Sequence, residues 1–182
     1  MHTPENTLET GRLLLRRLDA GVYAFIFDTF TDAEIMAFFD FSTPGELERE
    51  RERYHKGLAM HNKSFLWFLM VEKQSGRVIG SCGYHTWYTP HRRAEIGYAL
   101  TDPAKHGQGF MKEAMAAVIR YGFVHMDLHR IEAFVAPDNP ASLALVRGFG
   151  FRQEGHLREH YFKDGRMEDS LVFSLLQHEY MP

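Results

Sequence analysis

One segment, residues 92–126, constrains the fold of this chain more than any other. Its first part predicts a strand with apolar residues on one face, and with only small residues and Glu95 on the other. Asp102-Pro103 ends this strand, and Gly107 and Gly109 precede a helix with a single apolar stripe. The segment therefore predicts a strand, a glycine turn and an amphipathic helix.

The glycine turn is suited to a phosphate group. The first N–H groups of a helix have no partner within it, the helix dipole adds partial positive charge, and glycine leaves room for a ligand. Lys105, His106 and Lys112 are nearby cations, which favours a pyrophosphate. An ordinary tight strand-to-helix connection has the same pattern, so both interpretations stay open.

Composition limits the class of protein. The 182 residues predict one domain with a substantial core, and a net charge of −3 without a basic block argues against a nucleic-acid partner. The single cysteine, Cys82, excludes an intrachain disulfide and fits a reducing compartment. The N-terminus lacks a secretion signal, and no apolar run is long enough to span a membrane. We therefore expect a cytoplasmic protein.

The order of elements predicts one α+β domain at residues 11–180, preceded by a loose arm at residues 1–10. Asp19 is a candidate N-cap, and a second helix is expected at 32–39. The highly charged segment 45–62 predicts a solvated helix. Its expected inward residues are Leu47, Tyr54 and Leu58, with a Glu52–Lys56 pair. Strands are expected at 12–17, 65–72, 78–87, 130–136, 151–162 and 167–176, and the first helix should bury Val22, Phe25, Ile26, Thr29 and Phe30.

Three polar residues are candidates for chemistry. Glu95 could accept a proton from an amine, or it could form a structural ion pair with Arg92, Arg93 or Arg130. Asn139 could bind an amide-bearing ligand, although Asn before Pro is also typical of a helix N-cap. The Ser142 hydroxyl, in the first turn of that helix, could face a ligand or solvent.

Other reactive side chains point less clearly to a site. Cys82 has no base adjacent in sequence, which favours a buried strand cysteine over a nucleophile. His156 and His160 are too far apart in an extended strand to share a metal, so no metal site is expected. Tyr84 and Trp87 belong to an aromatic cluster, and the loop from Trp87 could line a substrate mouth.

Several short segments occur together in a specific order: TGRLLLR at 10–16, AEIGYAL at 94–100, HGQGFMKEA at 106–114, HRIEA at 129–133, PDNPASL at 137–143, GFGF at 148–151, EGHLR at 154–158, SLL at 174–176 and EY at 179–180. In this order the chain resembles the GCN5-related N-acetyltransferase (GNAT) superfamily, and within it the RimJ/RimL-like branch. The resemblance covers residues 10–180. Members of this branch acetylate protein N-termini and small amines.

The resemblance implies a mixed, mostly antiparallel sheet of about seven strands flanked by about four helices. Two central strands separate, and acetyl-CoA inserts between them. The backbone of Tyr98, Ala99, Leu100 and Thr101 would pair with the pantetheine arm. The pyrophosphate would be held at His106, Gly107, Gln108, Gly109, Phe110 and Met111.

The resemblance also implies roles for side chains. Asn139 would contact the pantetheine, Ser142 would lie near the sulfur as a proton donor, and Glu95 would be the general base. Tyr84 and Trp87, with Glu95, would line the acceptor site. The chain departs from the superfamily pattern at His106 and Met111 in the phosphate motif, and at Val146, where many members have a catalytic tyrosine. Met111 is expected to crowd the turn.

The predicted activity is acetyl-CoA-dependent N-acetylation of a primary amine. A protein N-terminus is the leading acceptor, and a small amine such as an antibiotic, polyamine or amino acid is the alternative. A non-catalytic acyl-CoA-binding module is a third possibility, and a homodimer is a further expectation. Acceptor specificity is expected to come from the loops at 38–44 and 87–91.

Overall fold

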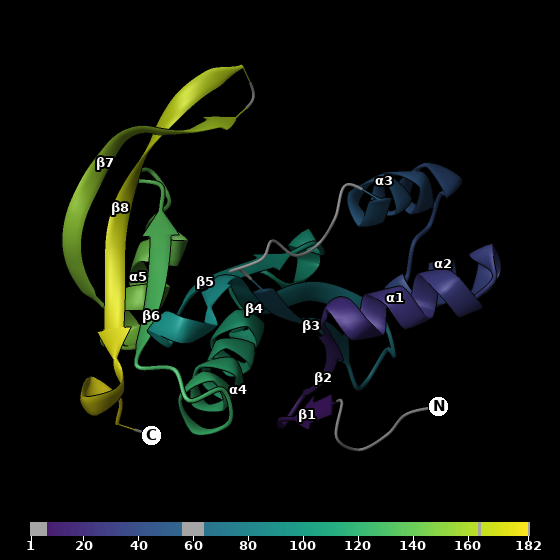
Figure 1. Cartoon of the computed structure of the whole chain (residues 1–182), viewed down its shortest axis with the longest axis horizontal. Coiled ribbons are helices and arrows are strands. Elements are labelled where there is room, and N and C mark those ends of the chain that lie inside the picture. Colours follow the sequence, from purple (N-terminus) through teal and green to yellow (C-terminus); the bar gives the residue numbers. More distant parts are fainter. Residues whose placement is uncertain (1–6, 56–63, 164, 182) are drawn as a thin grey trace.

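The computed structural model describes residues 7–55, 64–163 and 165–181 (Figure 1). Within these residues one eight-stranded sheet has the order β1-β2-β3-β4-β5-β6-β8-β7, one strand more than predicted. Neighbouring strands are antiparallel except for the parallel pair β5–β6. The strands are β1 Thr7–Glu9, β2 Leu13–Leu18, β3 Ser64–Glu72, β4 Val78–Tyr88, β5 Arg93–Leu100, β6 Arg130–Val135, β7 Arg152–Lys163 and β8 Arg166–Leu176.

Five α-helices accompany the sheet in the described residues, where about four were predicted. Local capping explains where two of them begin. Asp19 caps α1 by accepting a hydrogen bond from the Val22 N–H at 3.0 Å, and Thr31 and Glu34 form a capping box at α2. The helices are α1 Ala20–Thr29, α2 Asp32–Phe39, α3 Pro44–His55, α4 Phe110–Val124 and α5 Pro140–Gly148.

Hydrophobic cores lie on both faces of the sheet, and β3 contributes to each. Leu66, Phe68 and Met70 pack into the core that includes α4 and α5. Phe65 and Leu69, which alternate with them, pack into the second core with α1, α2 and α3. Figure 1 shows α4 separated from α1 and α2 by the strands.

The first helix differs from the prediction in which residues it buries. Tyr23 and Ile26 are its buried residues, whereas Phe25 is 59% exposed. Phe25 instead packs edge-on against Phe30 at a ring-centroid distance of 5.8 Å. Because aromatic residues lie on several sides of this helix, the sequence pattern did not identify correctly which side faces the core.

The charged helix forms as predicted within the part of the chain that is described. Leu47 is buried and Tyr54 is half-buried, which matches the expected inward residues. The predicted Leu58 contact and the Glu52–Lys56 pair involve residues outside the described ranges.

Residues 7–10, the described part of the arm expected at residues 1–10, bond to the rest of the domain. Thr7, Leu8 and Glu9 pair with Arg16, Leu15 and Leu14 of β2. The Lys73 ammonium also bonds to the Glu9 carboxylate and the Thr10 carbonyl, both at 2.6 Å. Residues 7–10 are therefore part of the domain's sheet edge.

No described helix is long and apolar enough to cross a membrane.

Candidate active site

The parallel strands β5 and β6 separate after only three residue pairs. Arg93, Ala94 and Glu95 pair with Arg130, Ile131 and Glu132. Beyond them β5 continues to Leu100 along β4, but no described residue of β6 pairs with it. Five residues of β5, 96–100, therefore have one edge open to an extended ligand, as the predicted separation of the central strands requires.

The glycine turn before α4 has the geometry of a phosphate cradle. Gly107 and Gly109 have φ angles of 71° and 80°, in the left-handed region that favours glycine. Gly109 is the N-cap of α4 and supplies no side-chain bond to the first N–H groups. Apart from its chain neighbours, no atom of the described residues lies within 4 Å of a Cβ built on Gly107, so the turn is open to a ligand.

Arg12, the residue before β2, stabilises this turn through several contacts. Its Nε and its backbone N–H donate to the Glu113 carboxylate at 2.7 and 2.6 Å, and its Nη1 donates to the Gln108 carbonyl at 3.0 Å. The guanidinium also stacks 4.1 Å from the centroid of the Phe110 ring. The sequence did not single out Arg12 as part of this turn.

The predicted cations are only partly available to a phosphate. Lys105 donates to the buried Glu72 carboxylate at 2.6 Å, so its charge is neutralised. His106 has Nε2 3.5 Å from the Leu100 carbonyl, and Lys112 is exposed. Met111, expected to crowd the turn, packs instead against the core on the α4 face.

Glu95 is a nearly buried carboxylate, with 7% of its surface exposed. Burial, with a further contribution from the negative charge of Glu132, raises the pKa of Glu95 to about 7. His85 Nε2 lies 3.3 Å from Glu95 Oε1, and burial lowers the pKa of His85. A hydrogen bond from Tyr161 partly opposes the rise in the pKa of Glu95. Glu95 is therefore placed to exchange a proton near neutral pH.

The alternative of an ion pair between Glu95 and an arginine is not found in the described residues. Arg92 pairs with Asp127, and Arg93 pairs with Glu132. Arg130 binds both Glu132 and Glu154.

A buried hydroxyl lies on the opposite face of β5. Burial raises the pKa of Tyr98, and the neighbouring Ser142 hydroxyl partly offsets that rise. No hydrogen bond of ordinary geometry joins the two groups, so Tyr98 Oη is buried without a partner among the described residues. Asn139 acts as the N-cap of α5, because its Oδ1 accepts a hydrogen bond from the Ser142 N–H at 3.0 Å.

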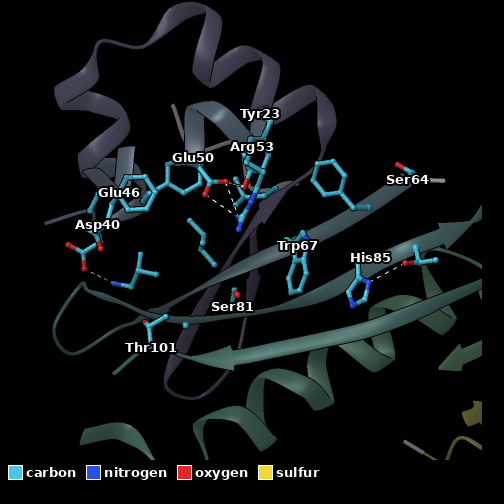
Figure 2. Close-up of a pocket in the computed structure, with 18 residues that line it drawn as sticks. Tyr23, Asp40, Glu46, Glu50, Arg53, Ser64, Trp67, Ser81, His85 and Thr101 are labelled. Atoms are coloured by element: carbon cyan, nitrogen blue, oxygen red, sulfur yellow. Dashed lines mark hydrogen bonds and ion pairs between the residues drawn. The ribbon is translucent and has the colours of Figure 1, made fainter. Parts of the chain in front are cut away.

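A cavity of about 780 Å³ lies between α1, α2, α3 and the strands. Figure 2 shows Trp67 and His85 along its strand side and Glu50, Tyr23 and Arg53 on its helix side. His85 connects the cavity to Glu95. The cavity is lined by Leu18, Tyr23, Phe39, Asp40, Phe41, Glu46, Glu50, Arg53, Ser64, Phe65, Trp67, Leu69, Val78, Gly80, Ser81, His85, Thr86 and Thr101. The predicted specificity loop at 38–44 thus contributes Phe39, Asp40 and Phe41.

Two predicted acceptor residues lie elsewhere. Tyr84 is fully buried toward α4, where its hydroxyl donates to the Val118 carbonyl at 2.9 Å, so its assignment to the acceptor site was wrong. Trp87 packs against the core on the α4 face and does not line the cavity. Trp67, which lines the cavity and stacks on His85 at a centroid distance of 5.9 Å, occupies the place expected for Trp87.

The other reactive side chains have structural surroundings. Cys82 is fully buried, and burial raises the pKa of its thiol, which disfavours the nucleophilic thiolate. His156 and His160 bond instead to Asp169 and Ser170. In the described part of the chain, no three His, Cys, Asp or Glu side chains are grouped to hold a metal ion.

The sequence missed His85, Trp67, Tyr161 and Glu132 as neighbours of the Glu95 site. The antiparallel register of two adjacent predicted strands could have paired His85 with Glu95. Tyr161 comes from a hairpin far along the chain, and no local signal marks its approach.

Comparisons with known proteins agree with this geometry. A family model described as "Acetyltransferase (GNAT) domain" matches residues 12–152. The uncharacterized N-acetyltransferase p20 of Bacillus licheniformis is 33% identical over 96% of this chain and 98% of its own length. The spermidine N(1)-acetyltransferase of Vibrio cholerae is 30% identical over 94% of this chain and 96% of its own length. A crystal structure of the Vibrio cholerae spermidine N-acetyltransferase in complex with CoA and spermine has a TM-score of 0.66, with 31% identity over 93% of this chain and 98% of that one. The chain belongs to the GNAT acetyltransferase family.

Proposed function

We propose that this protein transfers the acetyl group of acetyl-CoA to a primary amine of a small cationic acceptor, with di- and polyamines as the substrate class. The observation that carries this proposal is the cavity beside His85 and Glu95, which combines carboxylates with aromatic walls. Membership of the family establishes N-acetylation but not the acceptor, so the proposal adds the class of acceptor.

The charges of the cavity favour an acceptor with more than one ammonium group. Asp40, Glu46 and Glu50 line it; Asp40 pairs with Arg77 at 2.6 Å and Glu50 with Arg53, which leaves an excess of one carboxylate over arginine. The Glu50 side chain is only 12% exposed, accepts a hydrogen bond from Tyr23 Oη at 2.9 Å and pairs with the exposed Arg53 at 3.2 Å, so an ammonium group would join this pair. A carboxylate held in this way can bind a distal ammonium as a charge-assisted partner.

The apolar part of the cavity fits the rest of such a molecule. Tyr23, Phe39, Phe65 and Trp67 present aromatic rings, which can pack on methylene groups and attract cations over their faces. The relatives support the same class, since the spermidine N(1)-acetyltransferase of Vibrio cholerae is a matched relative and a matched structure from the same organism contains CoA and spermine.

Acetyl-CoA would supply the activated acetyl group at the separation of β5 and β6. The open edge of Tyr98, Ala99 and Leu100 is suited to the pantetheine arm, whereas the N–H of the predicted Thr101 donates to the Ile79 carbonyl at 3.0 Å. The turn from His106 to Met111, including Gly107, Gln108, Gly109 and Phe110, is suited to the pyrophosphate. Asn139 has its Oδ1 committed to the helix cap, so only its amide N–H₂ is left for the cosubstrate.

The proton transfers are assigned to groups on the two faces of β5. Glu95 accepts the proton of the acceptor ammonium, directly or through a water molecule, because its raised pKa suits exchange near pH 7. Ser142 remains the proposed donor to the departing thiolate, and the adjacent buried Tyr98 hydroxyl is a second donor.

A protein N-terminus, the RimJ/RimL-like branch, a homodimer and a cytoplasmic location remain predictions from the sequence. The non-catalytic acyl-CoA-binding alternative predicts binding without turnover. A peptide with a free N-terminal alanine, tested beside small amines, separates the two acceptor classes. Sedimentation velocity tests the dimer.

The experiment that tests the proposal is an acetylation assay on spermidine, spermine, a monoamine and the peptide. We expect the polyamines to have the highest kcat/KM. Glu50→Gln should raise the KM for spermidine about tenfold or more, since hydrogen bonds to charged groups contribute about 1.5–3 kcal/mol. The KM for acetyl-CoA should stay unchanged. Higher kcat/KM on the peptide than on any polyamine would overturn the substrate class.

The matched control is Glu48→Gln, which removes an exposed carboxylate of the same helix that does not line the cavity. It should leave the KM for spermidine unchanged. Equal effects of the two substitutions would mean that the overall charge of α3, and not the Glu50 site, attracts the amine.

A further inference from the structure

Glu132 faces Glu95 at the last paired position before β5 and β6 separate. The two residues are register partners in a parallel pair, so their side chains leave the sheet on the same face. Two carboxylates at neighbouring positions are normally unfavourable unless cations stand between them or one holds a proton.

The two arginine side chains near this pair of carboxylates, those of Arg93 and Arg130, bind Glu132 and not Glu95. Arg93 Nη1 donates to Glu132 Oε2 at 2.6 Å, and Arg130 Nε donates to Glu132 Oε1 at 2.9 Å. Arg130 also forms a two-pronged pair with Glu154, which accepts a further hydrogen bond from the Ser174 hydroxyl at 2.6 Å. Both carboxylate oxygens of Glu132 are therefore occupied by guanidinium groups.

The network balances in charge only when Glu95 is neutral. Glu132 and Glu154 carry two negative charges, and Arg93 and Arg130 carry two positive charges. Ionised Glu95 adds a negative charge, and no arginine among the described residues pairs with it. The other groups that face it are His85 from β4 and Tyr161 from β7, and neither carries a fixed positive charge.

We propose that Glu132 is a positioning residue for the acetyl transfer: by binding Arg93 and Arg130, it keeps both guanidinium groups away from Glu95 and so preserves Glu95 as a base. The inference rests on the proposed role of Glu95 as the proton acceptor. Without Glu132, the half-exposed Arg93 side chain, two residues before Glu95 on the same face of β5, is free to pair with it. An arginine-paired Glu95 would stay ionised to lower pH and would be a weaker base.

The test follows the acidic limb of the pH profile of kcat/KM in two variants with opposite expected signs. Glu132→Gln should move the limb at least about one pH unit lower, because an opposite charge within about 4–6 Å lowers a carboxyl pKa by about 1–3 units. The plateau at high pH should fall as well. Arg93→Gln should move the limb to higher pH. It removes one of the two positive charges that neutralise Glu132, so the negative charge of Glu132 opposes ionisation of Glu95 more strongly.

Glu154→Gln is the matched control, because it removes a carboxylate of the same network that does not contact Glu95. It should leave the limb in place. A merely structural role for Glu132 would lower activity at every pH without moving the limb, and that result would overturn the proposal.

A second readout does not require turnover. A ¹³C NMR titration of the glutamate side chains, with the Glu95 signal assigned by its loss in Glu95→Gln, gives the pKa of Glu95 directly. The same opposite displacements are expected in Glu132→Gln and Arg93→Gln. An unchanged pKa of Glu95 in both variants would overturn the proposal. Failure of the amine assay would overturn the proposed function while this titration still tested Glu132.

Discussion

At the scale of single residues, Glu95 is surrounded by groups that disfavour its charge, namely a buried setting and the neighbouring Glu132. Glu95→Gln keeps the shape but removes the proton acceptor. We expect kcat to fall about 10²- to 10⁴-fold, the usual contribution of a general base, with the affinity for acetyl-CoA unchanged. Steady-state kinetics and calorimetric titration check this. A loss of less than threefold would remove Glu95 from the reaction.

The same carboxyl links stability to pH. Its pKa is about 7 in the folded protein against an ordinary value of 4.5, so between these pH values the folded state holds a proton that the unfolded state releases. Stability therefore falls as pH rises from about 4.5 to 7, and the loss is complete above 7. Glu95→Gln should remove this loss.

Urea unfolding at pH 5 and pH 8 checks this linkage. Relative to wild type, Glu95→Gln should gain on the order of 1–2 kcal/mol more at pH 8 than at pH 5, after allowance for solvent screening. An equal effect of the substitution at both pH values would mean that Glu95 ionises normally in the folded protein.

The buried Tyr98 hydroxyl predicts a conflict between stability and function. A buried polar group without a partner costs about 1–3 kcal/mol, so Tyr98→Phe should stabilise the free protein. Its melting temperature should rise by about 2–4 °C for each kcal/mol, and kcat should fall if this hydroxyl serves the thiolate. Tyr84→Phe is the opposite control, because the Tyr84 hydroxyl has a partner in the Val118 carbonyl. It should lower the melting temperature.

At the scale of elements, the turn before α4 can be tested without changing any charge. Gly107→Ala meets no atom within 4 Å, but it adds a Cβ where a phosphate would lie and strains a φ of 71°. We expect a cost of about 1–2 kcal/mol in stability and a rise in the KM for acetyl-CoA.

Gly76→Ala is its matched control. Gly76 has a φ of 70°, an equally open Cβ direction and a position in the β3–β4 turn, outside the proposed site. It should cost the same stability and leave kinetics unchanged. A similar rise in KM in both variants would assign the effect of Gly107→Ala to general strain.

Elements with strong local signals were predictable from the sequence. The candidate N-cap Asp19 does begin α1, the helix expected at 32–39 forms as α2, and the crossover through α4 predicted the parallel pairing of β5 and β6. The short strand β1 was missed, because three residues that gain their partners only from β2 carry no periodic signal.

Only the site residues that lie close together in the sequence could be predicted. Glu95 and the glycine turn stand in one contiguous segment, and local physics identified both. Trp67, Tyr161 and Glu132 reach Glu95 or its cavity through pairing and curvature of distant strands. The wrong assignment of Tyr84 has a similar cause, since the sequence does not say which face of β4 lies against α4.

At the scale of the whole molecule, the sheet is joined across β5 and β6 by only three residue pairs. A ligand that fills the open edge should therefore stabilise the domain. Acetyl-CoA at about 100 times its Kd should add about 2.7 kcal/mol, or about 5–10 °C in melting temperature. ATP, which lacks the pantetheine arm, should give a much smaller shift.

Hydrogen exchange locates this effect. Backbone amides at 98–100 and 107–111 should gain protection with acetyl-CoA, whereas those of β1 should not. A uniform gain across the sheet, or none at 98–100, would contradict binding between the separated strands.

The contact between Tyr84 and α4 restricts how this sequence can diverge. A Cβ at Gly122 would lie 2.3 Å from Tyr84 Oη, while the same hydroxyl bonds to the Val118 carbonyl. A larger residue at position 122 therefore fits only after Tyr84 has been replaced by a smaller residue. That earlier replacement removes the hydrogen bond to the Val118 carbonyl. In descendants of this chain, Gly122 and Tyr84 should therefore be retained together. This constraint should keep α4, and the turn at its start, in the same position on β4. The acceptor cavity on the other face of the sheet is not subject to this constraint and can change.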